Sequence, residues 1–168
     1  LRLVAIDEVA EDLGLTRGMA LADARAMIPH LVVVDDDPAA DAALLDSIAD
    51  WAERYTPLVS LQEARRSEGP TGILILDITG CAHLFGGEEA MRADLLARLA
   101  AQGFLVRAAI ADTAGTALAL ARFTEGSVIA GTDTVTALAP LPLAALRLDP
   151  ETVSAMDRVG LKRIGQIV

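Results

Sequence analysis

One carboxylate, Asp77, stands near the end of an otherwise apolar run from Gly72 to Gly80. A short run of Ile and Leu bounded by Gly predicts a strand that is buried on both faces. A buried carboxylate is costly unless it is bonded, so Asp77 must bind a metal, take part in a reaction or bond its own backbone. The turn-forming residues of Asp-Ile-Thr-Gly favour the last interpretation, in which Asp77 caps the turn that follows it.

The other candidate ligands are few and scattered. Three Asp residues at 35–37 precede Pro38, and they are better explained as a charge cluster at a helix N-terminus than as a cation site. His30 and His83 lie far apart, and each is expected to be solvated or to cap a turn. The sequence has no phosphate-binding loop, no zinc-ligand spacing and no G-x-S-x-G turn. We therefore predict neither a bound metal nor a cofactor.

Hydrophobic spacing and turn residues predict alternating strands and helices. We expect strands at 1–6, 31–34, 57–61, 72–80, 104–110 and 127–130, and helices at 7–13, 21–28, 38–55, after Gly87, and at 113–122, 150–158 and 162–168. Residues 65–72 predict a loop, and 138–142 predict a linker because of their two prolines. The strand–helix–strand–helix–strand order from 72 to 130 predicts an α+β sheet with helices on one face. The last two helices predict a helix–turn–helix or helix–hairpin–helix unit.

Composition excludes several classes of protein. Hydrophobic residues make up 53% of the 168 residues, which excludes a disordered chain. No apolar run reaches the ~18 residues of a membrane span, and no signal peptide is visible. Cys81 is the only cysteine, which suits a reducing compartment, so we expect a cytoplasmic protein. The chain begins within a predicted strand, so we expect its native N-terminal part to be missing.

The net charge of −10 is unevenly distributed. Residues 1–106 contain 8 basic and 18 acidic side chains, whereas residues 107–168 contain 6 of each. Because duplex binding requires a basic surface, we expect weak DNA binding. Any contact should come from the C-terminal basic residues Arg107, Arg122, Arg158, Lys162 and Arg163.

Several motifs resemble one family in colinear order. Residues 13–25 (LGLTRGMALADAR) and 28–34 (IPHLVVV) resemble the fingers of Y-family lesion-bypass DNA polymerases. Residues 76–80 (LDITG) resemble the palm strand that follows their catalytic acids, and residues 160–167 (GLKRIGQI) resemble the end of their thumb. The resemblance covers nearly the whole chain. It implies a palm at 1–6 and 57–130, helical fingers at 7–56, and a partial helical thumb with a helix–hairpin–helix remnant at 131–168.

The catalytic acids of that family are not found at the matching positions. Active members carry Ser-x-Asp-Glu-Ala before Leu-Asp-x-Thr, and two-metal catalysis needs those acids. Counting back from Asp77 places Gly72 and Ile73 at the acid positions. A second alignment matches residues 60–64 (SLQEA) and treats 65–71 as an insertion, which places Gln62 and Glu63 there. Even then Gln62 is a neutral amide and a poor ligand for Mg²⁺.

Two further departures agree with this. The Asn-Lys-x-x-x-Ala-Lys run of active members becomes residues 113–118 (TAGTAL), which contain no lysine for phosphate. The glycine-rich hairpin of the thumb becomes residues 147–150 (RLDP), which lose amides that would face a phosphate.

The pattern is similar to the catalytically degenerate Y-family-like subunits of bacterial mutagenesis complexes. The resemblance implies a non-catalytic scaffold in damage-induced translesion synthesis. It also implies three partners, a sliding clamp, an error-prone C-family DNA polymerase and a RecA-like accessory protein, with contacts expected beyond Val168. Two alternatives remain, an active Y-family polymerase and an unrelated α+β interaction domain.

Overall fold

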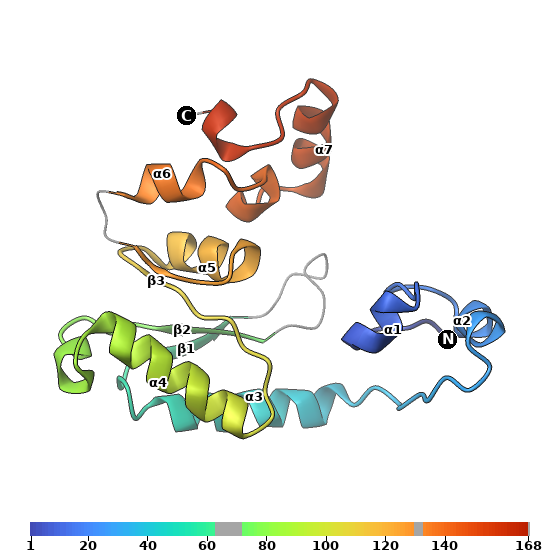
Figure 1. Ribbon diagram of the computed structural model, residues 1–168, viewed down its shortest axis with the longest axis horizontal. Helices are drawn as coiled ribbons and strands as arrows, with labels where there is room; N and C mark the ends of the chain where they lie inside the picture. Colours follow the sequence, from blue (N-terminus) through green and yellow to red (C-terminus); the bar gives the residue numbers. More distant parts are fainter. Residues whose placement is uncertain (63–71, 130–132, 168) are drawn as a thin grey trace. The chain divides into compact units, whose positions relative to one another are not determined.

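The computed structural model describes residues 1–62, 72–129 and 133–167, and the chain forms two compact units, Leu1–Asp77 and Ile78–Val168. The first unit contains α1 (Glu8–Asp12), α2 (Leu21–Met27), α3 (Pro38–Ala52), β1 (Val59–Gln62) and β2 (Ile73–Leu76) (Figure 1). The second contains η2 (Ala82–Phe85), α4 (Glu88–Ala101), β3 (Ile110–Ala111), α5 (Ala114–Phe123), β4 (Val128–Ile129), α6 (Thr134–Leu138), η4 (Leu143–Leu146), α7 (Pro150–Arg158) and η5 (Ile164–Gln166). These elements confirm the predicted α+β class.

Side-chain caps explain where several helices begin. The Asp7 carboxylate accepts a hydrogen bond from the Ala10 amide at 2.7 Å at the start of α1. Asp37 caps α3 in the same way, and Pro38 follows it at a position where no amide is needed. Thr113 caps α5 by accepting from the Thr116 amide at 3.2 Å. Capping of this kind is local in sequence, and the predicted starts of α1, α3 and α5 agree with the structure to within one residue.

Each unit has its own small core. In the first unit Ala10, Leu15 and Ala24 are buried together, and Leu3, Ile6, Met19, Ile28 and Leu31 pack against them. In the second unit the core contains Ala119, Leu120, Leu141, Leu143, Ala145 and Ile164. Trp51 and Tyr55 meet edge to face at 5.7 Å between ring centroids, an arrangement that packed aromatic pairs prefer.

Several predicted strands are wrong or too long. Residues 31–34 form no strand, and residues 1–6 contribute only an isolated bridge between Arg2 and Ala20. The strand predicted at 104–110 is reduced to β3, which pairs in parallel with β4. A β-branched run forms a strand only if a partner strand reaches it, and that partner is not local in sequence.

The strand predicted at 72–80 is reduced to β2. Among the described residues it pairs only with β1, in antiparallel register. Ile73 is buried, whereas the other three residues of β2 are only partly buried, so burial on both faces is not observed. Of the loop predicted at 65–72, only Gly72 lies within the described residues.

The predicted linker at 138–142 is instead part of the C-terminal core. Leu141 is 5% exposed, and its carbonyl accepts from the Ile164 amide at 3.0 Å. The Gly165 amide donates to Ala139 O at 2.9 Å, so the two segments lie side by side. The helix predicted at 162–168 is the short η5, which follows the Gly160 turn after α7. The palm, fingers and thumb boundaries themselves stay predictions.

Candidate functional site

Both alignments of the missing acids lead to the same end of the β1–β2 hairpin. Gln62 is the last residue of β1, and it lies directly opposite Ile73, the first residue of β2. Cross-strand partners project from the same face of a sheet. Gln62 and Ile73, which are eleven positions apart in sequence, therefore lie at the same place in the structure. A polymerase of the resembled family would need carboxylates there.

The described side chains at this location do not provide such a cluster. Ile73 is 7% exposed, so its side chain belongs to the core. A Cβ atom at Gly72 would lie 2.1 Å from Cδ2 of Leu45, so any larger residue there would displace that side chain. Gln62 is exposed, and Glu63 lies outside the described residues. Across the residues that the structure describes, no group of three or more His, Cys, Asp or Glu side chains could hold a metal ion.

Asp77 is exposed, so the prediction of a buried carboxylate is wrong. The residue lies just beyond the end of β2, and its backbone amide and carbonyl both form hydrogen bonds. Its amide donates to Leu58 O at 3.0 Å, and its carbonyl accepts from the Thr56 hydroxyl at 2.5 Å. Thr56 is 2% exposed and also accepts from the Leu58 amide, so it joins the end of α3 to the end of β2. That Asp77 caps the following turn stays a prediction.

The first two basic candidates, Arg107 and Arg122, lie together in the second unit. The Arg107 guanidinium donates to the Arg122 carbonyl at 3.2 Å, at the C-terminal end of α5. Both residues line a surface hollow with Phe123, Thr124 and Glu125. A helix C-terminus is electronegative and Glu125 is acidic, so this hollow is a weak site for a phosphate despite its two arginines.

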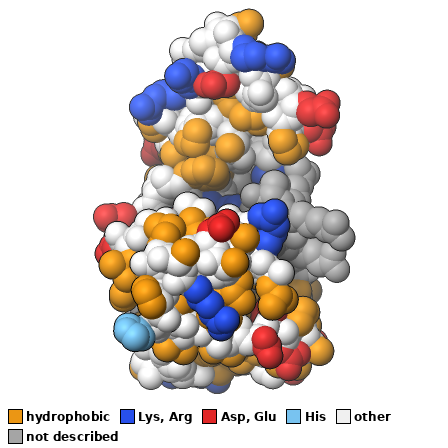
Figure 2. Space-filling model, turned by 90° about the vertical axis from the view of Figure 1, so that its right-hand side faces the viewer, with side chains coloured by type: hydrophobic (Ala, Val, Ile, Leu, Met, Phe, Trp, Pro, Cys, Tyr) orange, Lys and Arg blue, Asp and Glu red, His pale blue; other side chains and the backbone are white. Residues whose placement is uncertain are grey.

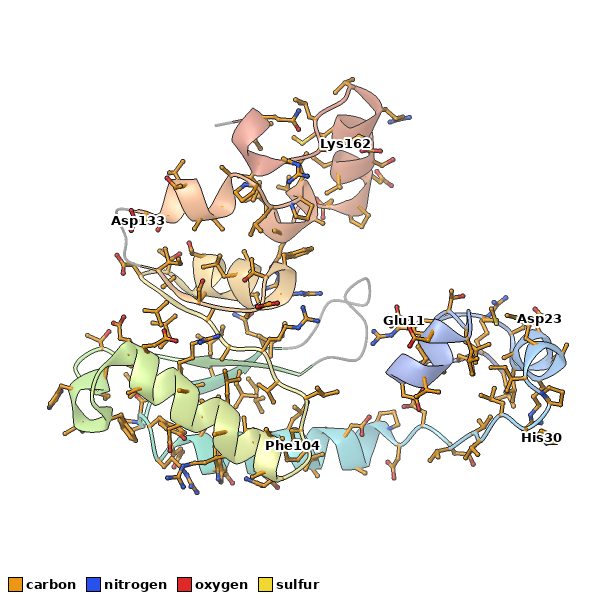
Figure 3. The ribbon with its side chains drawn as sticks, in the orientation of Figure 1. Glu11, Asp23, His30, Phe104, Asp133 and Lys162 are labelled. Carbon is orange, nitrogen blue, oxygen red and sulfur yellow. The ribbon has the colours of Figure 1, made fainter. Side chains whose placement is uncertain are left out.

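The other three basic candidates, Arg158, Lys162 and Arg163, flank the Gly160 turn in sequence, and Lys162 is labelled in Figure 3. Lys162 Nζ lies 3.9 Å from Asp157 Oδ1, and Arg163 donates to the Pro140 carbonyl at 2.7 Å. Lys162 thus already has a carboxylate nearby, and the Arg163 guanidinium already donates one of its hydrogen bonds within the unit. On the face shown in Figure 2, basic side chains are scattered among acidic and apolar ones rather than gathered in one area.

Arg92 is a structural residue that sequence reasoning missed. Its side chain, 14% exposed, extends from α4 and donates to Ala108 O at 2.8 Å and to Gly126 O at 3.0 Å. It also pairs with Glu89 at 3.0 Å. The guanidinium thereby ties α4 to the segments that lead into β3 and β4. No spacing rule could reveal the two bonds to Ala108 and Gly126, because these acceptors are backbone carbonyls far away in sequence.

Comparisons with known proteins agree with the motif-based resemblance. The model of the impB/mucB/samB family matches residues 2–122. Protein ImuB of Caulobacter vibrioides, in strains NA1000 / CB15N and ATCC 19089 / CIP 103742 / CB 15, is 49% identical over 157 residues, which is 93% of this chain. The chain spans 33% of the length of those relatives.

Two solved structures share the fold. The crystal structure of DinB from Sulfolobus solfataricus matches with a TM-score of 0.70 at 16% identity, covering 94% of this chain and 46% of that one. A DinB family error-prone DNA polymerase from the same organism matches with a TM-score of 0.71 at 16% identity, covering 96% of this chain and 49% of that one.

None of the described helices is long and apolar enough to cross a membrane. The family match excludes an unrelated interaction domain, and the chain belongs to the impB/mucB/samB family.

Proposed function

We propose that the chain is the polymerase-like part of a non-catalytic Y-family subunit that acts as a scaffold in damage-induced mutagenesis and translesion synthesis. The observation that carries this proposal is the hairpin end, where exposed Gln62 faces buried Ile73. The similarity to protein ImuB supports the same role. Because the chain spans about a third of that relative, its activity and partners belong to the proposal.

The exposure of the hairpin residues favours the alignment that places Gln62 and Glu63 at the acid positions. A metal ligand must be reachable by substrate, and Gln62 is exposed whereas Ile73 is in the core. Two-metal phosphoryl transfer needs carboxylates that hold both ions beside the attacking and leaving oxygens. A neutral amide neither offsets the cation charge nor competes well with water, so Glu63 alone would not hold the pair of ions.

We expect no nucleotide incorporation by the purified full-length protein in a primer-extension assay with either Mg²⁺ or Mn²⁺. The physical reason is the lack of a paired carboxylate site at the hairpin end. An active Y-family polymerase on the same primer-template serves as the positive control. The Glu63→Ala variant serves as the matched control for this chain, because it removes the remaining acid of the motif.

Extension that persists in Glu63→Ala, and that a mock purification without the protein does not give, would show a site that does not need Glu63 and would also contradict the expected inactivity. Extension by the wild type that is lost in Glu63→Ala would show a working site. The proposal would then be wrong, and the alternative of an active Y-family polymerase would be correct.

The partners that we propose follow from the family resemblance. They are a sliding clamp, an error-prone C-family DNA polymerase and a RecA-like accessory protein, and we propose that these partners bind outside residues 1–168. A scaffold of this kind contributes by holding partners near one another, which raises their effective concentration without chemistry of its own.

DNA binding by this chain should be weak and strongly salt-dependent. We expect a Kd above about 1 μM for duplex DNA at about 150 mM salt in a fluorescence-anisotropy titration, which is the non-specific range. Replacing both Arg158 and Lys162 by Gln should weaken binding further and flatten the salt dependence, because two phosphate contacts are lost. Arg98→Gln on α4, whose side chain bonds Asp94 at 2.8 Å, is the control and should change little.

Sub-micromolar binding at that salt concentration would contradict the DNA prediction. So would binding that is unaffected after Arg107, Arg122 and Arg163 are also neutralised, because the affinity would then come from another surface.

A further inference from the structure

We draw no further inference here: the strongest candidate, the surface hollow at the C-terminal end of α5 that Arg107, Arg122 and Phe123 line, belongs to the candidate DNA-contact residues already described, and nothing in the structure shows a different ligand that would fill it.

Discussion

Replacing Arg92 by Ala will lower the free energy of unfolding by about 3 kcal/mol. The side chain is 14% exposed, and its guanidinium donates to the carbonyls of Ala108 and Gly126 at 2.8 and 3.0 Å. These carbonyls belong to segments that precede strands of only two residues each, β3 and β4. Removing the donor leaves two part-buried acceptors unsatisfied, and each costs on the order of 1–3 kcal/mol. Urea denaturation followed by circular dichroism measures the loss.

Arg98 on the same helix provides the matched control. Its Nε lies 2.8 Å from Asp94 Oδ2, and its side chain is 53% exposed. An exposed i,i+4 pair contributes only about 0.3–0.5 kcal/mol, so Arg98→Ala should barely move the urea midpoint. Arg92→Lys should fall in between, because a single ammonium cannot reproduce the planar fork. Equal losses for Arg92→Ala and Arg98→Ala would show that the bonds of Arg92 carry no special weight.

The helices of this chain could be predicted because their signals are local. Asp7, the Asp37–Pro38 pair and Thr113 begin α1, α3 and α5 as their residue types predict. Strands depend on partners elsewhere in the sequence. The valines at 32–34 have no partner strand among the described residues. The segment around Leu141, interpreted as a linker because of its prolines, instead pairs with residues 163–165 and enters the core.

Only the residue types at the candidate site could be predicted from the sequence. That Gly72, Ile73 and Gln62 lack a carboxylate is evident from the sequence, and the hairpin register then places Gln62 and Ile73 at one location. The exposure of Asp77 was not predictable, because it depends on where β2 ends. Thr56 and Arg92 donate hydrogen bonds to the backbone carbonyls of residues 77, 108 and 126. The order of side-chain types along the sequence does not show which carbonyls will lie near these donors.

Gly126→Ala will be at least as damaging as the loss of Arg92, with an expected cost of about 3 kcal/mol or more. Gly126 has φ +82°, a left-handed conformation that alone costs a residue with a Cβ atom roughly 1–2 kcal/mol. Its Cβ atom would also lie 2.2 Å from Ala108 O and 3.2 Å from Arg92 Nη2. The first contact is to backbone, so relief requires moving Ala108, whose carbonyl is the acceptor for Arg92.

Gly103→Ala separates the steric contribution from the conformational one. Gly103 has φ +88°, nearly the same backbone conformation, but a Cβ atom there meets no atom within 4 Å. It should therefore lose only the roughly 1–2 kcal/mol of left-handed strain. Thermal and urea melts of the two variants give the difference directly. If Gly126→Ala costs no more than Gly103→Ala, then Ala108 can move freely and the contacts of Arg92 do not fix this part of the unit. In the double variant with Arg92→Ala, a loss smaller than the sum of the two single losses would show that both residues act on the same carbonyl.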